Sequence, residues 1–187
     1  MLTVILTGGS SRRMGRDKAM LPYGDGTLLQ TLIDRFGAFG PVGVSLDRSG
    51  RFPFEGAAEL VDRFPGAGPM NGVVSGFRET GEDELLLTAV DLPYGDPALA
   101  LRLSALRGGA DACVVRRSPE EIEPLFAVYG RSCLSAAEDC LKEGRRSLRA
   151  LFERIDVRYA RPEELPGFDL DRIFTNVNTP EEYRKLK

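Results

Sequence analysis

The sequence predicts an α/β fold built on a mostly parallel sheet. Short apolar segments typical of buried strands alternate along the chain with segments of helical periodicity. This alternation is typical of strands that are joined by helices and lie parallel in one sheet. The length of 187 residues fits one domain, residues 1–187, and the 42% hydrophobic content is enough for a packed core.

The first half of the chain carries strands at residues 2–7, 41–46, near 58–62 and at 84–90. The last of these reads ELLLTAV and lacks polar alternation, which indicates a strand buried on both faces. A helix is expected from Thr27 to about Ala38, where Thr27 and Gln30 have the spacing of a capping box. A short helix over 71–78 follows a loop rich in proline and glycine.

In the second half, Asp96 and Pro97 begin a helix as its N-cap and first residue, and the glycines at 108 and 109 end it. Strands are predicted at 111–115, 125–129 and 155–159, and helices at about 132–142 and 147–153. A last helix begins after Thr179, with proline next and a glutamate at the capping-box position. Because ligands bind at the carboxyl ends of such strands, the segments after each strand should converge on one edge of the sheet.

The composition narrows the chemistry that this chain can perform. It has no histidine, which excludes imidazole bases, Ser-His-Asp and Cys-His nucleophilic sites, and histidine-ligated zinc. Carboxylates, lysine, backbone amides or a hard metal ion remain. The cysteines at 113, 133 and 140 form no CxxC pair, and we interpret them as buried thiols in a reducing compartment.

Charge and hydropathy favour a cytoplasmic protein. The net charge of -3 lacks the basic excess of a general nucleic-acid binder. The first apolar run is too short for a signal peptide, and no segment approaches the roughly 20 apolar residues of a membrane span. We therefore expect a cytoplasmic location and neither nucleic-acid nor membrane partners.

A cationic loop that contains glycine follows the first predicted strand and reads TGGSSRRMGRDK. Gly8 and Gly9 allow backbone angles that point amide groups at a ligand. The loop fits neither the Walker A nor the GxGxxG pattern. Its place after a buried strand favours phosphate binding, and the alternative is an ordinary solvated loop. The positive charges belong to Arg12, Arg13, Arg16 and Lys18.

This opening stretch resembles the signature of the molybdenum cofactor guanylyltransferases, Leu-x-Gly-Gly-x-Ser-x-Arg-Met-Gly-x-Asp-Lys. Its Gly-Gly, Arg-Met-Gly and Lys core is shared by the wider nucleotidyltransferase superfamily. The resemblance implies a three-layer αβα, Rossmann-like fold with a mostly parallel sheet. It also implies nucleotide contacts from Leu6, Thr7, Gly8, Gly9 and Lys18. The matching residues are Leu6, Gly8, Gly9, Ser11, Arg13, Met14, Gly15, Asp17 and Lys18.

One acid, Asp91, directly follows the buried strand at 84–90. A carboxylate at this place suits Mg²⁺, which takes one or two protein carboxylates together with phosphate oxygens and water. Spacing alone leaves open a role in a turn or as an N-cap. The family carries Asp-x-Pro-[Tyr/Phe] here, matched by Asp91, Pro93 and Tyr94, and the resemblance implies that Asp91 binds Mg²⁺ and the nucleotide.

The segment VDRFPGAGPMNG, residues 61–72, resembles a nucleotide-binding loop of the same family. That loop is an acid followed by Pro-Gly-x-Gly-Pro-Leu-x-Gly, so Asp62 fits the acid and Gly68 one of the glycines, while Met70 replaces a leucine. Guanine presents N1–H and N2–H₂ donors, so its pocket needs carbonyl or carboxylate acceptors. Without the resemblance, the segment reads as a surface turn.

Near residue 178, FTNVNTPEEY resembles the family's Asn-Val-Asn-Thr-Pro-Glu signature. Thr179 suffices as the helix cap, which leaves Asn176 and Asn178 for another role. The resemblance implies that Asn178 helps to hold the metal ion and that both asparagines contact the bound nucleotide or the pterin substrate.

Two further segments resemble the acceptor side of the family, EPLFAVYG from Glu123 and GRRSLRALF from residue 144. Arg145, Arg146 and Arg149 are candidates for the acceptor's terminal phosphate or, equally, an exposed helix face. The chain departs from the family pattern where Ser45 and Asp47 replace asparagines and where Glu123 replaces glutamine or histidine. We still assign Ser45 to the nucleotide.

The resemblance implies transfer of GMP from GTP to molybdenum-molybdopterin, with release of pyrophosphate. The acceptor phosphate is already anionic, so no general base is needed. Lys18, Arg13 and Asp91 are the predicted catalytic residues, and Asp91 and Asn178 the predicted Mg²⁺ ligands. Molybdoenzymes and cofactor-insertion proteins are candidate partners. The alternatives are a cytidylyl or sugar-phosphate nucleotidyltransferase of the same superfamily and a nucleotide-binding module without turnover.

Overall fold

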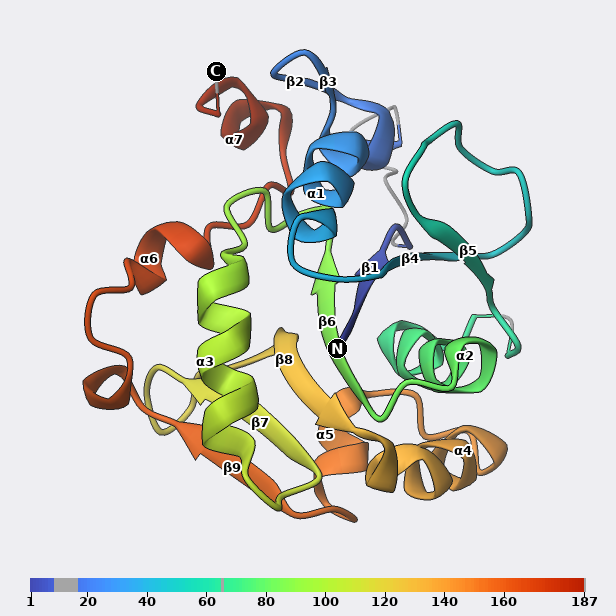
Figure 1. Ribbon diagram of the computed structural model, residues 1–187, viewed down its shortest axis with the longest axis vertical. Helices are drawn as coiled ribbons and strands as arrows, with labels where there is room; N and C mark the ends of the chain where they lie inside the picture. The colour runs from blue at the N-terminus through green and yellow to red at the C-terminus, as the bar shows by residue number, and fades with distance from the viewer. Residues whose placement is uncertain (9–16, 65, 187) are drawn as a thin grey trace.

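The computed structural model describes residues 1–8, 17–64 and 66–186. Its centre is a seven-stranded sheet in the order β5-β4-β1-β6-β8-β7-β9 (Figure 1). Every neighbouring pair is parallel except the two pairs that involve β8, which runs antiparallel to β6 and β7. The predicted α/β fold with a mostly parallel sheet is confirmed. The strands are β1 (Leu2–Leu6), β4 (Val42–Leu46), β5 (Ala58–Val61), β6 (Glu84–Ala89), β7 (Ala112–Arg116), β8 (Ile122–Gly130) and β9 (Val157–Ala160).

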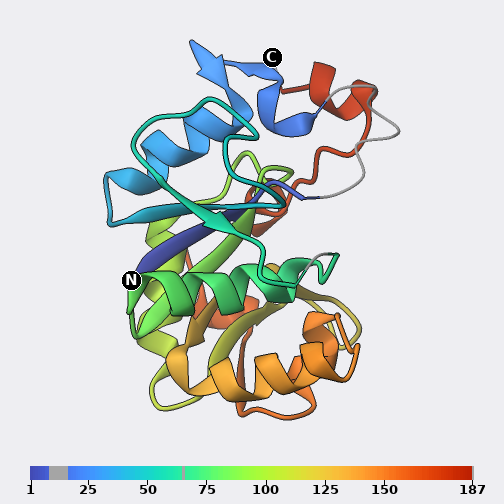
Figure 2. The ribbon, with the colours of Figure 1, turned by 90° about the vertical axis from the view of Figure 1, so that its right-hand side faces the viewer.

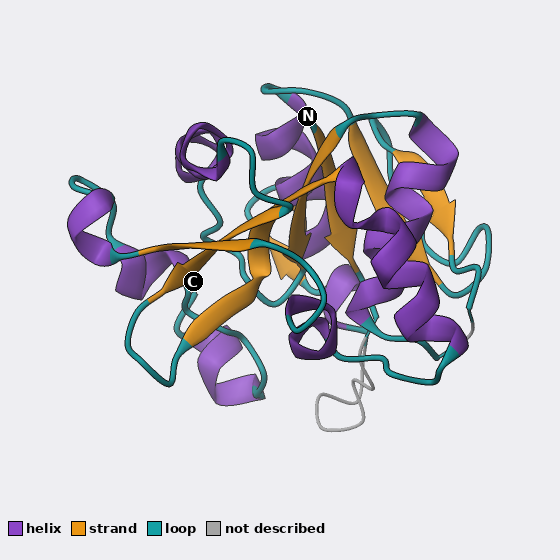
Figure 3. Ribbon diagram, turned by 90° about the horizontal axis from the view of Figure 1, so that it is seen from below, coloured by secondary structure: helices purple, strands orange, loops and turns teal. Residues whose placement is uncertain are grey.

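Helices cover both faces of the sheet, so the fold has three layers (Figures 2 and 3). Successive side chains of each strand point to opposite faces of the sheet and therefore belong to two separate hydrophobic cores. One core packs Ile5 of β1 against α1 and α3, and the other packs Val4 against α2, α4 and α5. The helices are α1 (Leu28–Gly37), α2 (Pro69–Thr80), α3 (Pro97–Arg107), α4 (Leu134–Lys142) and α5 (Leu148–Phe152).

Short elements complete the described chain. The sequence did not predict the small β2–β3 hairpin, the 3₁₀ turns η2 and η4, or the one-turn helix α6. The helix α7 lies beside that hairpin, where the Tyr183 hydroxyl donates to the carbonyl oxygen of Pro22 (Figure 1). These elements are η2 (Lys18–Met20), β2 (Pro22–Tyr23), β3 (Gly26–Thr27), η3 (Arg131–Cys133), η4 (Pro162–Glu164), α6 (Leu170–Ile173) and α7 (Pro180–Arg184).

Helix caps account for most of the predicted helix starts. The Asp96 carboxylate accepts a hydrogen bond from the Ala98 N–H at 2.8 Å, and Thr179 forms a complete capping box with Glu182. At α1, the Thr27 hydroxyl accepts from the Gln30 N–H, but the Gln30 side chain donates to Asp34 instead of returning to the cap. The spacing therefore predicted the cap of α1 correctly and its capping box wrongly.

The three cysteines are buried and unpaired, as the sequence predicted. Burial raises the pKa of Cys113 to about 11 and that of Cys133 to about 12, so these thiols stay protonated and unreactive near neutral pH. In the part of the chain that the structure describes, no helix combines the length and the hydropathy that a membrane crossing requires.

Gly72 allows α2 to lie close against β1 and β6. A Cβ at Gly72 would lie 2.5 Å from Cδ2 of Leu6 and 3.3 Å from Cδ1 of Leu87. We expect Gly72→Ala to lower the free energy of unfolding by about 1–3 kcal/mol, the usual cost of overpacking a core. Urea unfolding measures this change. Gly37→Ala is the control, because its added methyl group meets no atom within 4 Å, and equal effects of the two substitutions would contradict the packing argument.

Candidate active site

A cleft of about 600 Å³ opens at the carboxyl ends of β1, β4, β5 and β6. Segments far apart in the sequence meet here because parallel strands end at the same edge of the sheet. The loop after each of these strands contributes to the wall. The lining includes Leu6, Gly8, Ser45, Asp47, Arg51, Asp62, Gly66, Gly68, Asp91 and Leu125.

One end of the cleft is a chain of hydrogen bonds across three strands. The buried Thr7 hydroxyl donates to the Ser45 carbonyl oxygen at 2.7 Å, and the Ser45 hydroxyl donates to Oδ1 of Asp62 at 3.0 Å. The Thr7 hydroxyl thus holds β4 in place. Ser45 and Asp62 both line the cleft, and the carboxylate retains further acceptor positions for a ligand.

The loop after β5 is held by its own polar contacts. Oδ1 of the buried Asn71 accepts from the Phe64 N–H at 3.2 Å, and Gly68 adopts a φ of 66°, in the region that favours glycine. The Gly66 carbonyl oxygen accepts from a guanidinium N–H of Arg146 at 3.1 Å. Of the three arginines assigned to the acceptor phosphate, Arg146 therefore reaches the wall of the cleft.

The other two arginines of that group lie elsewhere. The Arg145 guanidinium forms an ion pair with Glu153, and Arg149 is exposed on α5. The structure thus separates the three side chains and brings one of them to the cleft.

Desolvation raises the pKa of the half-buried Asp62 carboxyl, against the lowering effects of the Ser45 hydroxyl and the Asn71 amide. Nearby Asp47 raises the pKa further and Arg51 lowers it. A ligand that donates hydrogen bonds would relieve this cost, as the N–H groups of guanine would.

Asp62→Asn should raise the melting temperature at pH 7. A raised folded-state pKa means that stability is present at low pH and is lost as the pH rises through that pKa, because the folded carboxyl resists ionisation. Asparagine removes this charge and keeps an oxygen for the Ser45 hydroxyl. Thermal melts at pH 7 and below pH 3.8, the ordinary aspartate value, test this. A gain that persists at the lower pH would contradict the linkage.

Residues from three distant segments meet around Asp91, which lines the cleft. Lys18 in η2 donates to Oδ1 of Asn178 at 2.7 Å. The Val177 N–H donates to the Asp91 carbonyl oxygen at 2.9 Å, so the segment before α7 is bound to the end of β6. Burial raises the pKa of the Asp91 carboxyl, and the charge of Lys18 opposes that rise.

The two predicted asparagines have different surroundings. Both are exposed, but only Asn178 meets Lys18, while the Asn176 amide donates to the Phe174 carbonyl oxygen at 3.3 Å. The Asn178 N–H donates to Glu182 at 2.6 Å, so the capping box of α7 also fixes the backbone of Asn178.

The donor set fits a cation that brings most of its own ligands. Oδ1 of Asp91 is shielded from solvent and has no hydrogen-bond partner in the described chain, which leaves it free to bind a positive charge. Across residues 1–8, 17–64 and 66–186, no three acidic, cysteine or histidine side chains cluster as a metal cage. One free carboxylate oxygen suits Mg²⁺ carried by a triphosphate, whereas Oδ1 of Asn178 already accepts from Lys18.

Arg51 lies in the cleft and was missed by the sequence analysis. Its guanidinium forms ion pairs with Asp17 at 3.1 Å and Asp47 at 3.0 Å, so it connects the residue before Lys18 to the loop after β4. The ring of Phe52 lies 4.8 Å from its guanidinium carbon. The departure at Asp47 was the available signal, because it places an acid close to Arg51 in the same loop.

The remaining predicted residues lie outside the described chain, in the cleft or on β8. Gly9 and Arg13, with the rest of 9–16, lie outside the described residues. Leu6 and Gly8 line the cleft. Glu123 lies on β8 beside Arg117, whose guanidinium is 3.5 Å from its carboxylate, and burial raises the pKa of Glu123.

The doubly wound sheet with this cleft at its carboxyl edge has the architecture of a nucleotidyltransferase. Residues 3–160 match the family model of the MobA-like NTP transferase domain. The chain belongs to the MobA-like NTP transferase family.

Similar proteins cover nearly the whole chain. A probable molybdenum cofactor guanylyltransferase of Pelotomaculum thermopropionicum is 30% identical over 189 residues, covering 98% of this chain and 90% of the relative. Among solved structures, the Archaeoglobus fulgidus molybdopterin-guanine dinucleotide biosynthesis protein A has a TM-score of 0.85 at 24% identity and covers 100% and 96%. The Thermus thermophilus 2-C-methyl-D-erythritol 4-phosphate cytidylyltransferase shares the fold, with a TM-score of 0.69 at 17% identity, over 98% and 95%.

Proposed function

We propose that this chain transfers GMP from GTP to molybdenum-molybdopterin in a Mg²⁺-dependent reaction that yields the molybdopterin guanine dinucleotide cofactor and pyrophosphate. The observation that carries the proposal is that Lys18 and Asn178 are hydrogen-bonded to each other near Asp91, in a cleft that Asp91 and Asp62 both line. The names of the relatives support the identity of the acceptor.

The base end of the cleft favours guanine by its hydrogen-bonding pattern. The carboxylate of Asp62 can accept from N1–H and N2–H₂ of guanine together, whereas cytosine offers only its N4 amine. Ser45 holds one oxygen of Asp62 and so fixes the plane of the carboxylate. A site built to hydrogen-bond a substrate group rejects analogues that lack it, because its buried polar groups are then left unpaired.

The phosphate end acts through charge and position. An oxygen of the acceptor phosphate attacks the α-phosphorus in line, and the bond from the α-phosphorus to the bridging oxygen of pyrophosphate breaks. Lys18 donates to the departing pyrophosphate, and Asn178 holds the ammonium group of Lys18 in position. No residue has to remove a proton, because the acceptor phosphate enters as an anion.

Asp91 would hold the Mg²⁺ ion, while Oδ1 of Asn178 accepts from the Lys18 ammonium group and would join the ion only if that hydrogen bond is exchanged. When bound, the ion neutralises developing phosphate charge and orients the α-phosphate. The unpartnered Oδ1 of Asp91 supports this role, since a shielded carboxylate oxygen without a donor attracts a cation strongly. We also propose a cytoplasmic location and delivery of the product to molybdoenzymes or to cofactor-insertion proteins.

Pyrophosphate release by the purified chain tests the function. The assay uses the pterin acceptor, Mg²⁺ and each of GTP, CTP, UTP and dTTP in turn. We expect turnover with GTP and at least about 100-fold lower kcat/KM with CTP, since a missing hydrogen-bond partner in such a site is costly. Turnover with CTP would indicate a cytidylyltransferase, turnover with a sugar phosphate another transferase, and binding without turnover a nucleotide-binding module.

A further inference from the structure

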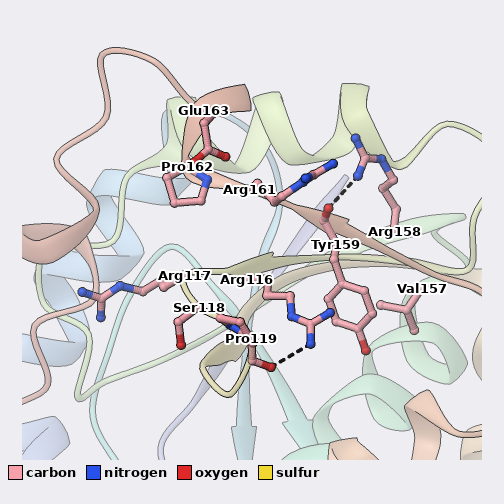
Figure 4. Close-up of a pocket in the computed structure, with 10 residues that line it drawn as sticks. All are labelled: Arg116, Arg117, Ser118, Pro119, Val157, Arg158, Tyr159, Arg161, Pro162 and Glu163. Atoms are coloured by element: carbon pink, nitrogen blue, oxygen red, sulfur yellow. Dashed lines mark hydrogen bonds between the residues drawn. The ribbon is translucent and has the colours of Figure 1, made fainter.

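A second cavity, of about 630 Å³, lies where β7 and β9 end and η4 begins (Figure 4). Parallel β7 and β9 end at the same edge of the sheet as β6, but β8 and β7 separate β9 from β6. We call this space the arginine cavity. The charged and aromatic side chains that line it are Arg116, Arg117, Arg158, Tyr159, Arg161 and Glu163.

Two of the four arginines are neutralised by carboxylates. Arg117 forms ion pairs with Glu121 at 3.1 Å and Glu123 at 3.5 Å, and also with Asp171. The Arg158 guanidinium forms an ion pair with Glu164 and donates to the Tyr159 carbonyl oxygen. The charges of Arg117 and Arg158 are therefore offset by carboxylates of the protein itself.

The other two, Arg116 and Arg161, form no ion pair with a described residue. Arg116 is fixed nonetheless, because its guanidinium donates to the Pro119 carbonyl oxygen at 2.7 Å and lies 5.1 Å from the ring centroid of Tyr159. Its Nε is shielded from water and has no acceptor. The charge of a guanidinium without a carboxylate partner acts on the adjacent space, and it is less screened on the side where Nε is shielded.

Arg161 is exposed at the same cavity. The Arg161 backbone N–H lowers the pKa of Glu164, and Arg158 and the charge of Arg161 lower it further. Glu164 forms its ion pair with Arg158, so Arg161 has no ion-pair partner of its own among the described residues.

We propose that the arginine cavity is a second ligand site, which binds a phosphate-class oxyanion carried by a molecule of metabolite size. Planar guanidinium groups match the geometry of phosphate oxygens, and the Tyr159 ring offers apolar surface for the rest of the ligand. The volume lies within the roughly 300–1,000 Å³ of small-molecule sites. The assignment stands apart from the proposed transfer reaction, because none of these residues belongs to the nucleotide cleft.

Glu163 allows a test in which the proposal predicts tighter, rather than weaker, binding of the anion. Among the described residues that line the cavity, it alone is acidic, and it is exposed. A carboxylate beside an anion site repels the ligand, so Glu163→Gln should tighten binding while Arg116→Gln and Arg161→Gln weaken it. A merely solvated cavity would respond to none of these substitutions.

Calorimetric titration with inorganic pyrophosphate, and separately with inorganic phosphate, tests the site. The titrations use a Lys18→Ala background, so that the first site contributes little heat. We expect Arg116→Gln to weaken pyrophosphate binding about tenfold, as loss of a charged hydrogen bond does, and Glu163→Gln to tighten it about twofold. Arg78→Gln is the control, because Arg78 pairs with Glu138 on the far helices α2 and α4.

A second experiment asks which molecule carries the oxyanion. This experiment rests on the proposed function, whereas the titrations do not. In otherwise wild-type enzyme, a higher KM for the pterin acceptor in Arg161→Gln, together with weaker pyrophosphate binding, would place the oxyanion on the acceptor. Weaker pyrophosphate binding with an unchanged KM would instead identify a free reaction product as the ligand. Arg161 is exposed, so its variant should fold even if Arg116→Gln does not. Unchanged anion binding and unchanged KM in both Arg161→Gln and Glu163→Gln would overturn the proposal.

Discussion

Asp91→Asn should lower kcat for pyrophosphate release by about 10²–10³-fold, because it removes the charge that faces the reacting phosphates. The shape of the side chain is kept, and the Val177 N–H still finds the backbone carbonyl oxygen of residue 91. The substitution should therefore leave the segment before α7 in place. The loss should appear in kcat measured at saturating GTP and Mg²⁺.

The same variant should be at least as stable as the wild type at pH 7. Burial raises the pKa of Asp91, so ionisation of this carboxyl costs stability as the pH rises through that pKa, and asparagine removes the cost. Asp96→Asn is the control in the same segment, because asparagine also caps helices well and the cap of α3 should persist. Activity close to that of the wild type in Asp91→Asn would refute the catalytic assignment.

Lys18→Ala should lower kcat by about 10²-fold, since it removes one preorganised donor to the leaving group. The turn η2 should survive, because Ala19 is buried in the core beside α1 and holds it in place. Steady-state kinetics with GTP measures the loss, and Lys142→Ala, at an exposed position of α4, is the matched control.

A double-mutant cycle between Lys18 and Asn178 asks whether the two act as a unit. If Asn178 works by holding the Lys18 ammonium group, the double variant should lose little more activity than Lys18→Ala alone. Additive losses would instead assign Asn178 an independent contact with the metal ion or a substrate. A loss confined to KM in Lys18→Ala would contradict its role in the departure of pyrophosphate.

Local sequence signals predicted most of the larger elements. Buried apolar runs located the strands, and the caps at Asp96 and Thr179 located two helix starts, because these signals depend on neighbouring residues. The reversed direction of β8 had a signal that was not used, since residues 117–121 are too few for a parallel crossover. The hairpin β2–β3 and α6 are too short for periodicity to reveal.

The site residues that come soon after a strand were predictable from the sequence. Asp62 and Asp91 stand directly after β5 and near the end of β6, so topology alone places them on one edge. The contacts between segments were not predictable, because they depend on side-chain paths. The Arg51 ion pair with Asp17 and the meeting of Arg116 with Tyr159 each join residues that are distant in sequence.

The hydrogen bonds from Val177 to Asp91 and from Lys18 to Asn178 also make the surroundings of Lys18 depend on a segment that follows the whole sheet in the chain. All seven strands of the main sheet precede residues 174–178, so none of its ladders includes that segment. The sheet and the base end of the cleft can thus form while Lys18 still lacks its partner. A molecule in which that segment is undocked could retain a nucleotide without consuming it, and turnover would begin only when the segment that carries Asn178 docks.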